Sequence, residues 1–368
     1  MKHPADWMIG KNADNAVVIT SRIRLARNLR DVSFPGWAKK TERVEVMNQI
    51  RPVVEDLRWM KKAFSQELSE LDSMQKQVLV ERHLISREQA ARAAGSAAVI
   101  DRGQRLSLMI NEEDHLRMQS IRAGLHLREA HDLLNEVDES LEQELEFAFD
   151  RQLGYLTACP TNLGTGMRAS AMLHLPALVL SDQIGQVLQA VSKIGLAVRG
   201  LFGEGTESLG HLFQISNQST LGESEDAIIN RLERVINQVA NHERNARLKM
   251  MEEEKGMISD KIGRAYGILS YAQLFDSKEA FAHISLIRLG ADLGFFPEET
   301  MHMCDSLMME IQPAHLQMIA GTELEPEKRD IIRAEILRDR LQSLDAPVNN
   351  NTNNQAEGDG PDGDHPNE

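Results

Sequence analysis

The sequence has only two cysteines, Cys159 and Cys304, among its 368 residues. So few thiols exclude a disulfide scaffold and a cysteine-rich zinc site. No apolar run reaches the roughly 18 residues that a membrane-spanning helix needs. The N-terminal segment MKHPADWMIG contains no signal-peptide core, so we expect a cytoplasmic protein that does not bind a membrane. Acids outnumber Lys and Arg by 56 to 41, and this net charge of −15 argues against direct binding of nucleic acid through bulk charge.

Several motifs that handle phosphate or metal are also missing. The sequence contains no P-loop, no dinucleotide-binding glycine fingerprint, no zinc-protease helix, no serine-hydrolase elbow and no protein-kinase signature set. None of the 12 histidines is spaced like a metal-binding pair, so we expect no metal ligands in the protein itself. If the chain handles phosphate, it does so by another arrangement.

The pattern of apolar residues predicts an α+β protein. Helical spacing is found at 41–72, with a break or kink at Pro52, and again at 112–148, 177–193 and 223–255. Short aliphatic or β-branched segments predict strands at 16–20, 96–100, 105–110, 153–158, 170–175, 196–200 and 211–216. Because hairpins and helices both connect these strands, we expect a largely antiparallel sheet flanked by helices, followed by a small all-α domain.

Three regions are predicted along the chain. Residues 1–256 hold every predicted strand, whereas residues 257–344 contain only short helical patterns, at 258–275, 277–293, 297–310 and 325–343. Residues 345–368 carry six acids and no Lys or Arg, and they contain too few apolar side chains to order themselves. We expect this tail to be disordered and solvated, although a role in peptide docking stays open.

Arginine is the residue type that can replace a P-loop. The segment SRIRLARNLR places Arg22, Arg24, Arg27 and Arg30 within nine residues. If the strand that begins at Ala16 continues, Arg22 and Arg24 point to the same face. Neighbouring guanidinium groups repel each other, so this pairing favours a multiply anionic ligand such as the phosphates of a nucleotide. A solvated basic edge strand is the alternative.

Three further segments have the composition of functional loops. NEEDHLR, residues 111–117, follows an apolar strand with three acids that either bind a cation or begin a helix. Residues 159–170 start at Cys159 and form a loop rich in Gly, Thr and Asn that can present backbone N–H groups to an anion. The cysteine can equally be an inert core residue. Residues 199–207 hold three glycines around Glu204, which indicates either a loop that closes over a substrate or a plain surface connection.

Together these segments resemble the phosphagen kinase family, which moves phosphate between ATP and a guanidinium group. The matching motifs are SRIRLAR, NEEDHLR, CPTNLGT followed by RAS, and RG followed by GE, in the family's order, and ERHLIS at 81–86 also matches. The resemblance spans about residues 15–255. It implies the family's catalytic domain, with a glutamine-synthetase-like sheet, for residues 1–256, and it implies ATP with Mg²⁺ as cofactors.

The resemblance also implies a role for each matching residue. It implies that the phosphates of the nucleotide are held by Arg22, Arg24, Arg117, Arg168 and Arg199. It implies that His83 lies near the adenosine end, that Glu113 and Glu204 hold the substrate guanidinium, and that Cys159 contacts it. Arg168 also belongs to the expected catalytic set, because it would stabilise the charge on the transferred phosphate.

Within the family, the sequence is most similar to the bacterial protein-arginine kinases. The arginine motif begins at Ser21, without the helical domain that encloses free amino acids in the small-molecule enzymes. The loop continues GEGTE instead of GEH, and QISNQ replaces DISN. The C-terminal element RDIIRA implies a regulatory phosphoarginine pocket formed by Arg329, Asp330 and Arg333, although these residues also fit a plain amphipathic helix.

This branch implies ATP-dependent transfer of phosphate to arginine side chains of proteins, in stress response and protein quality control. The implied partners are protein substrates, an activator protein, a Clp-type unfoldase and protease, and a second copy in a homodimer. A kinase for a small guanidino compound and a phosphoarginine-binding adaptor with little catalysis are the alternatives. The retained Glu113, Cys159, Arg168, Arg199 and Glu204 argue against the adaptor.

Overall fold

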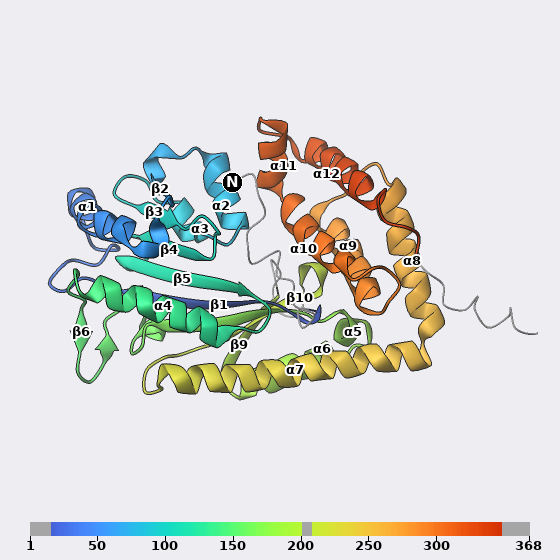
Figure 1. Ribbon diagram of the computed structural model, residues 1–368, viewed down its shortest axis with the longest axis horizontal. Coiled ribbons are helices and arrows are strands. Elements are labelled where there is room, and N and C mark those ends of the chain that lie inside the picture. The colour runs from blue at the N-terminus through green and yellow to red at the C-terminus, as the bar shows by residue number, and fades with distance from the viewer. Residues whose placement is uncertain (1–15, 201–207, 348–368) are drawn as a thin grey trace, which may run out of the picture.

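The computed structural model describes residues 16–200 and 208–347, and Figure 1 shows how their helices and strands are arranged. Within these residues, eight strands form one antiparallel sheet in the order β2-β3-β4-β5-β1-β8-β10-β9. The strands are β1 (Val18–Arg27), β2 (Phe64–Glu67), β3 (Ala97–Ile100), β4 (Leu106–Ile110), β5 (Leu116–Ala123), β8 (Met167–His174), β9 (Leu196–Gly200) and β10 (Leu212–Asn217). A separate hairpin contains β6 (Phe149–Asp150) and β7 (Gly154–Tyr155). The expected antiparallel α+β fold is confirmed.

One face of the sheet is apolar. Alternate residues of the central strands, such as Ile23 and Leu25 on β1 and Phe213 and Ile215 on β10, are at least 98% buried. Helices α4 (Leu127–Glu142), α6 (Ile184–Lys193) and α7 (Glu225–Glu253) cover this face, α4 against β1 and β5, α6 against β9 and α7 against β8 and β10. Each large side chain buried here contributes about 1.5–3 kcal/mol, so this layer stabilises the sheet.

The opposite face is apolar at only one end. There, Leu79 and Leu84 pack with Ile100 and Met109 in a small second core. Helix α2 (Ser73–Glu81) lies over this core and is capped by Asp72. Helix α1 (Lys40–Asp56) packs against β3 and β4 from the other side, as part of the main core. The remaining short helices of this part are α3 (Arg87–Ala90) and α5 (Pro176–Leu180). The middle of the face is left to polar side chains.

The C-terminal helices pack beside the sheet, on the right in Figure 1. They are α8 (Lys255–Tyr271), α9 (Ser277–Asp292), α10 (Glu299–Glu310), α11 (Pro313–Ala320) and α12 (Pro326–Leu341). Helix α11 docks on α2, where Glu81 accepts hydrogen bonds from the backbone N–H groups of Ala314 (2.7 Å) and His315 (3.0 Å) and from His315 Nδ1 (2.7 Å). One hydrophobic core includes residues on both sides of position 256, and the division into domains stays a prediction.

A buried polar junction fastens the same helices to the end of the sheet. Ser285 Oγ of α9 lies 2.7 Å from both His174 Nε2 and His211 Nδ1. Arg288 donates to the carbonyl oxygen of Ala16 at 2.7 Å, just before β1 begins. These buried groups are satisfied by one another, so they tie α9 to β8 and β1 without leaving polar atoms unpaired.

Several predicted elements differ from the structure. Residues 116–123 were expected to be helical but form β5, because Leu116 and Met118 face the core while Arg117 and Gln119 face away, which is a period of two. The helix predicted over 41–72 continues through Pro52 but ends at Asp56, and β2 and α2 follow. The strand predicted over 153–158 is reduced to Gly154–Tyr155. Most of the predicted tail 345–368 lies outside the described residues.

Candidate active site

Arginines gather on the polar face of the sheet. In the register of β1 and β8, Arg24 faces Arg168, and Arg22 lies two residues further along the same face of β1. On β5, Arg117 faces Ala26, the next residue of this row of β1. Strand alternation therefore brings basic side chains from three adjacent strands to one face, as predicted for Arg22 and Arg24.

Arg199 extends the row at the edge of the sheet. It faces Gln214 across β9 and β10, and its side chain is exposed. Gln214 in turn faces Met172 of β8, which lies opposite Thr20 in the row that carries Arg22. Because directly opposed residues share a face, Arg199 belongs to the same polar surface.

The arginines are held in an electrostatically unfavourable arrangement. Burial, followed by repulsion from Arg117 and Arg168, lowers the pKa of Arg22 to about 10. Burial and then repulsion from Arg22, Arg117 and Arg168 lower the pKa of Arg24 well below its ordinary value. The Nε atoms of Arg24 and Arg168 are buried and have no hydrogen-bond partner among the described residues. These N–H donors lack acceptors, and the guanidinium groups repel one another. Both features fit a multiply charged anion that binds between these side chains.

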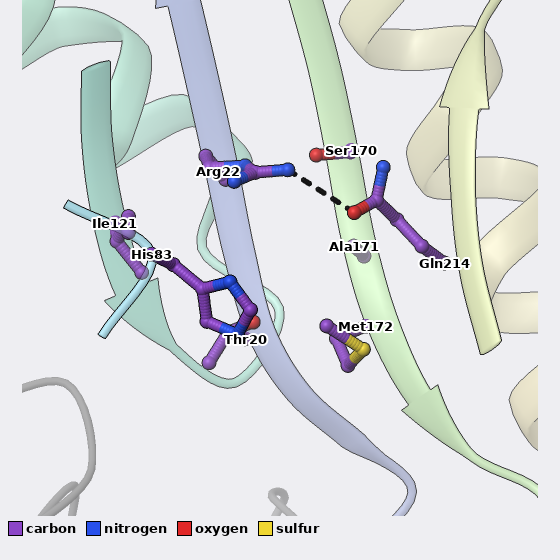
Figure 2. Close-up of a pocket in the computed structure, with 8 residues that line it drawn as sticks. All are labelled: Thr20, Arg22, His83, Ile121, Ser170, Ala171, Met172 and Gln214. Carbon is purple, nitrogen blue, oxygen red and sulfur yellow. Dashed lines mark hydrogen bonds between the residues drawn. The ribbon is translucent and has the colours of Figure 1, made fainter. Parts of the chain in front are cut away.

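A small pocket adjoins the arginines, between β1, β8 and His83, which lies two residues after the end of α2 (Figure 2). Its lining includes Arg22, His83, Ser170, Met172 and Gln214, and Arg22 Nη2 donates to Gln214 Oε1 at 3.1 Å. Burial and then the charge of Arg22 lower the pKa of His83 to about 4, so its imidazole is neutral at pH 7. A neutral ring beside a thioether suits an uncharged heteroaromatic group next to the anion.

His83 is held in place by its backbone. It has a positive φ of 57°, and its carbonyl oxygen accepts a hydrogen bond of 2.6 Å from Gln119 Nε2 of β5. Glu81, two residues earlier, is the residue that binds α11. The pocket wall at His83 is therefore continuous with the docking site of the C-terminal helices.

The three successive acids after β4 have different surroundings. Glu112 is buried and accepts hydrogen bonds from Arg117 Nη1 (2.6 Å), Ser86 Oγ (2.5 Å) and the backbone N–H of Glu113 (2.9 Å). Burial acts to raise the pKa of Glu112, but Arg117 and the hydrogen bond from Ser86 outweigh it and lower the pKa. Glu112 thus stays ionised and orients one of the clustered arginines.

Asp114 is also buried, and Glu113 is the exposed carboxylate of the three. Asp114 accepts hydrogen bonds from Asn28 Nδ2 (2.6 Å) and from the backbone N–H of Ala158 (2.7 Å). Partial desolvation, followed by repulsion from Asp114 and Glu112, raises the pKa of Glu113. An exposed carboxylate with a raised pKa, beside a cluster of cations, is suited to accept a proton from a substrate.

Cys159 precedes a single turn, Pro160–Asn162, in the loop that leads to β8. Its side chain is half-buried, and Sγ lies 3.0 Å from Thr161 Oγ1. Burial and then repulsion from Arg199 and Arg117 lower the pKa of Arg168, whereas the charge of a Cys159 thiolate would raise it. Cys159 therefore lies within electrostatic range of the arginine cluster.

Not every predicted site residue joins this surface. Glu204 lies outside the described residues. Arg329, Asp330 and Arg333 lie on α12, among the C-terminal helices. Arg333 is 1% exposed and donates to the carbonyl oxygens of Phe275 (2.6 Å) and Ile311 (3.1 Å) and to Asp330 Oδ1 (2.5 Å). These contacts fasten α12 to its neighbours, and the phosphoarginine pocket stays a prediction.

Sequence reasoning missed the polar residues that support the cluster. Gln119, Gln214 and Ser216 line the same face, and Ser216 Oγ accepts from Arg168 Nη2 at 3.4 Å. Their alternation along β5 and β10 was a signal in the sequence. The separate contacts of Glu112 and Asp114 had no such signal, because their partners are remote in sequence.

No helix in residues 16–200 and 208–347 is long and apolar enough to cross a membrane. In the same residues, no three His, Cys, Asp or Glu side chains are grouped so that they could hold a metal ion.

The sequence matches two known family descriptions. Residues 45–246 match the ATP:guanido phosphotransferase C-terminal catalytic domain, and residues 255–353 match the protein-arginine kinase McsB C-terminal domain. The chain is 44% identical over 344 residues to the protein-arginine kinase of Moorella thermoacetica, covering 93% of this chain and 98% of that protein. It is 43% identical over 350 residues to the protein-arginine kinase of Brevibacillus brevis, covering 94% and 98%.

Solved structures show the same fold. Lombricine kinase is 26% identical with a TM-score of 0.55, over 64% of this chain and 68% of that chain. The duplicated taurocyamine kinase from Schistosoma mansoni, with bound components of a transition state analog, is 22% identical with a TM-score of 0.57. That match covers 80% of this chain and 48% of the duplicated enzyme.

Proposed function

This chain belongs to the protein-arginine kinase branch of the ATP:guanido phosphotransferases, and from that premise we propose that it transfers the γ-phosphate of ATP to arginine side chains of proteins. The observation that carries the proposal is the arginine cluster on the polar face of the sheet, beside Glu113 and Cys159. Two of its Nε atoms have no partner among the described residues, and burial and mutual repulsion lower the pKa values of Arg22 and Arg24. An anion acceptor site next to an exposed carboxylate is what phosphate transfer to a cation requires.

The arginine cluster would hold the triphosphate. Arg22 and Arg24 from β1, with Arg117, Arg168 and Arg199 from the neighbouring strands, offer enough donors to replace the hydration of the phosphates. Mg²⁺ would enter with the nucleotide and neutralise part of its charge. The pocket at His83 would receive the nucleoside end, because a neutral imidazole tolerates an uncharged base.

The acceptor is the harder chemical problem, since a guanidinium is protonated at neutral pH. Glu113 would orient it in line with the γ-phosphate, with Glu204 as the second carboxylate expected from the family. As the terminal guanidinium nitrogen forms its bond to phosphorus, the bond to the bridging oxygen breaks and ADP leaves. The displaced proton passes to the Glu113 carboxylate, and Arg168 stabilises the charge on the moving phosphate.

The finer biology is proposed from the family. The relatives named protein-arginine kinase align over nearly their whole length, which supports protein side chains as acceptors. We propose that the mark directs proteins to a Clp-type protease in the cytoplasm, with an activator protein. The C-terminal helices would supply the homodimer interface and the phosphoarginine pocket at Arg329 and Asp330.

The test is mass spectrometry without acid, because a phosphorus–nitrogen bond is acid-labile. The protein is incubated with Mg-ATP and an arginine-containing test protein, and in parallel with free arginine. Phosphate on protein arginines, with free arginine unchanged, is the expected result. Phosphate on free arginine alone would assign a small guanidino compound as substrate. Transfer to neither, with retained binding of phosphoarginine, would leave an adaptor.

A further inference from the structure

The third arginine of SRIRLAR is not part of the nucleotide surface. Arg27 ends β1 and is 2% exposed, one of the largest fully buried side chains among the described residues. It lies an odd number of positions from Arg22 and Arg24, so strand alternation sends it to the other side of the sheet. There it meets α4, where Asp138 Oδ2 lies 2.5 Å from Nη2 and both carboxylate oxygens lie 3.1 Å from Nε.

The same guanidinium contacts both arms of the loop that carries Cys159. One arm contains Tyr155, and Arg27 Cζ lies 3.5 Å from the centre of its ring. The other arm contains Thr165, whose carbonyl oxygen accepts from Arg27 Nη1 at 3.0 Å. The two arms are joined directly, because the backbone N–H of Tyr155 donates to the carbonyl oxygen of Gly164 at 2.8 Å. Arg27 thus holds the two arms of the loop together at their ends.

Three glycines are adapted to this arrangement. Gly166 has a φ of +68°, and a Cβ there would come within 2.7 Å of Arg27 Nη1. Gly164 has a φ of +112°, and a Cβ on the facing Gly154 would lie 2.3 Å from its carbonyl oxygen. Only glycine fits at these positions, because any Cβ would collide with a neighbouring backbone or with Arg27. The stem of the loop, residues 154–155 and 164–166, can therefore pack closely against itself and against the guanidinium.

The next residue anchors the start of the loop. Asn28 Nδ2 donates to the carbonyl oxygen of Leu156 (3.0 Å) and to Asp114 Oδ1 (2.6 Å). Asp114 Oδ1 also accepts from the backbone N–H of Ala158, the residue before Cys159. The end of β1 therefore fixes the loop on both sides of the cysteine.

We propose that Arg27 is a positioning residue that sets where Cys159 meets the acceptor arginine, an inference that rests on the proposed function. A buried ion pair is rarely the most stable way to fill a core, since apolar residues of similar volume stabilise as well or better. The pair of Arg27 and Asp138 instead supplies a rigid fork that reaches three groups at once. Lysine can replace its charge but not this geometry.

The test compares Arg27→Lys with Arg288→Lys. Arg288 is an equally buried guanidinium with its own ion pair to Asp305 (2.7 Å) and a bond to a backbone carbonyl, but it lies at the junction of α9 and the sheet. The first readout is the alkylation rate of Cys159 by iodoacetamide, followed by peptide mass spectrometry. Cys304, the other thiol in the sequence, is 1% exposed and has a pKa raised by burial, so its labelling reports unfolding.

In Arg27→Lys we expect the alkylation rate of Cys159 to change at least about threefold, because lysine cannot hold Asp138 and the carbonyl oxygen of Thr165 together and the stem of the loop loosens. The KM for the protein acceptor should rise at least about fivefold for the same reason, while the Kd for Mg-ATP stays within about twofold. In Arg288→Lys, the alkylation rate of Cys159, the KM for the acceptor and the Kd for Mg-ATP should equal those of the unchanged protein. Asp138→Asn should reproduce the effect, and the double variant should add little to it.

The proposal is overturned if Arg27→Lys matches Arg288→Lys in Cys159 alkylation, or if the Kd for Mg-ATP weakens as much as the KM for the acceptor. If Cys304 is labelled in Arg27→Lys, that variant is unfolded. Asp138→Asn then tests the proposal by the same criteria. Failure of the proposed function would show as no transfer by the unchanged protein. The alkylation rates decide the positioning role even then, because they require no turnover.

Discussion

We predict that Arg24 lowers the stability of the nucleotide-free protein although it is needed to bind the nucleotide. The perturbation is Arg24→Met, which keeps a long side chain but removes one charge from the polar face. Arg24 is repelled by Arg22, Arg117 and Arg168 and attracted by Glu112, and its Nε has no partner. A cationic group whose pKa is lowered by folding destabilises the folded state at every pH below its ordinary pKa, and for an arginine this includes neutral pH.

The size of the effect follows from the strand geometry. Facing and diagonal residues of neighbouring strands have Cβ atoms roughly 5–8 Å apart, and we take this as the spacing of their charges. With an effective dielectric constant of about 20, each like-charged pair costs about 2–3 kcal/mol. Three repulsions less one attraction, reduced again by solvent screening, leave a net gain of about 2 kcal/mol on removing Arg24. For a chain of this size, with an unfolding entropy of about 0.7 kcal/mol/K, that corresponds to a rise in Tm of about 3 °C.

The assay is thermal unfolding with and without Mg-ATP. Without nucleotide, Arg24→Met should melt above the unchanged protein. With nucleotide at about 100 times its Kd, the unchanged protein should gain about 2.7 kcal/mol and melt above the variant, which has lost its affinity. The control is Arg128→Met on the exposed side of α4, which should show neither change. A ligand-free Arg24→Met protein that melts below the unchanged one would refute the electrostatic reasoning.

Three further predictions concern turnover. Glu113→Gln should lower kcat by about 10²–10⁴-fold with an unchanged Kd for ATP, because Glu113 acts on the acceptor guanidinium and not on the nucleotide, and near-normal turnover would contradict the assignment. The acid limb of the kcat/KM profile against pH should lie above the ordinary range of a glutamate, since desolvation, Asp114 and Glu112 raise the pKa of Glu113 and its protonated form cannot accept a proton. A limb at or below that range would argue against Glu113 as the base. Arg329→Ala should keep basal transfer but lose any response to free phosphoarginine, and an unchanged response would discard the pocket.

The sequence predicts the face on which an arginine lies wherever polar and apolar residues alternate along a strand. Arg22 and Arg24 share a row because they are two residues apart in a strand, and the same rule holds for the row of Gln214 and Ser216 on β10. Arg117 was recognised by resemblance, although its segment was expected to be helical. Three acids before it resembled a helix start, and only the pairing with β1 reveals a strand.

Contacts between distant segments could not be predicted. Arg27 meets Thr165 across 138 positions and Asp138 across 111, and no local pattern connects them. The same limit explains why Glu112, Glu113 and Asp114 looked equivalent in the sequence. Their roles differ because one faces Arg117, one faces solvent and one faces Ala158, and this depends on packing that a single sequence does not encode locally.

The two-sided character of β1 has an evolutionary consequence. One row of its side chains faces the arginine cluster and the other faces the core, so an insertion or deletion of a single residue would exchange the rows and place guanidinium groups among Ile23 and Leu25. Such a change would remove catalysis and folding in one step. This strand can therefore diverge by substitution but not by change of length, whereas the exposed tip of the turn between β1 and α1, at Gly36 and Trp37, tolerates both.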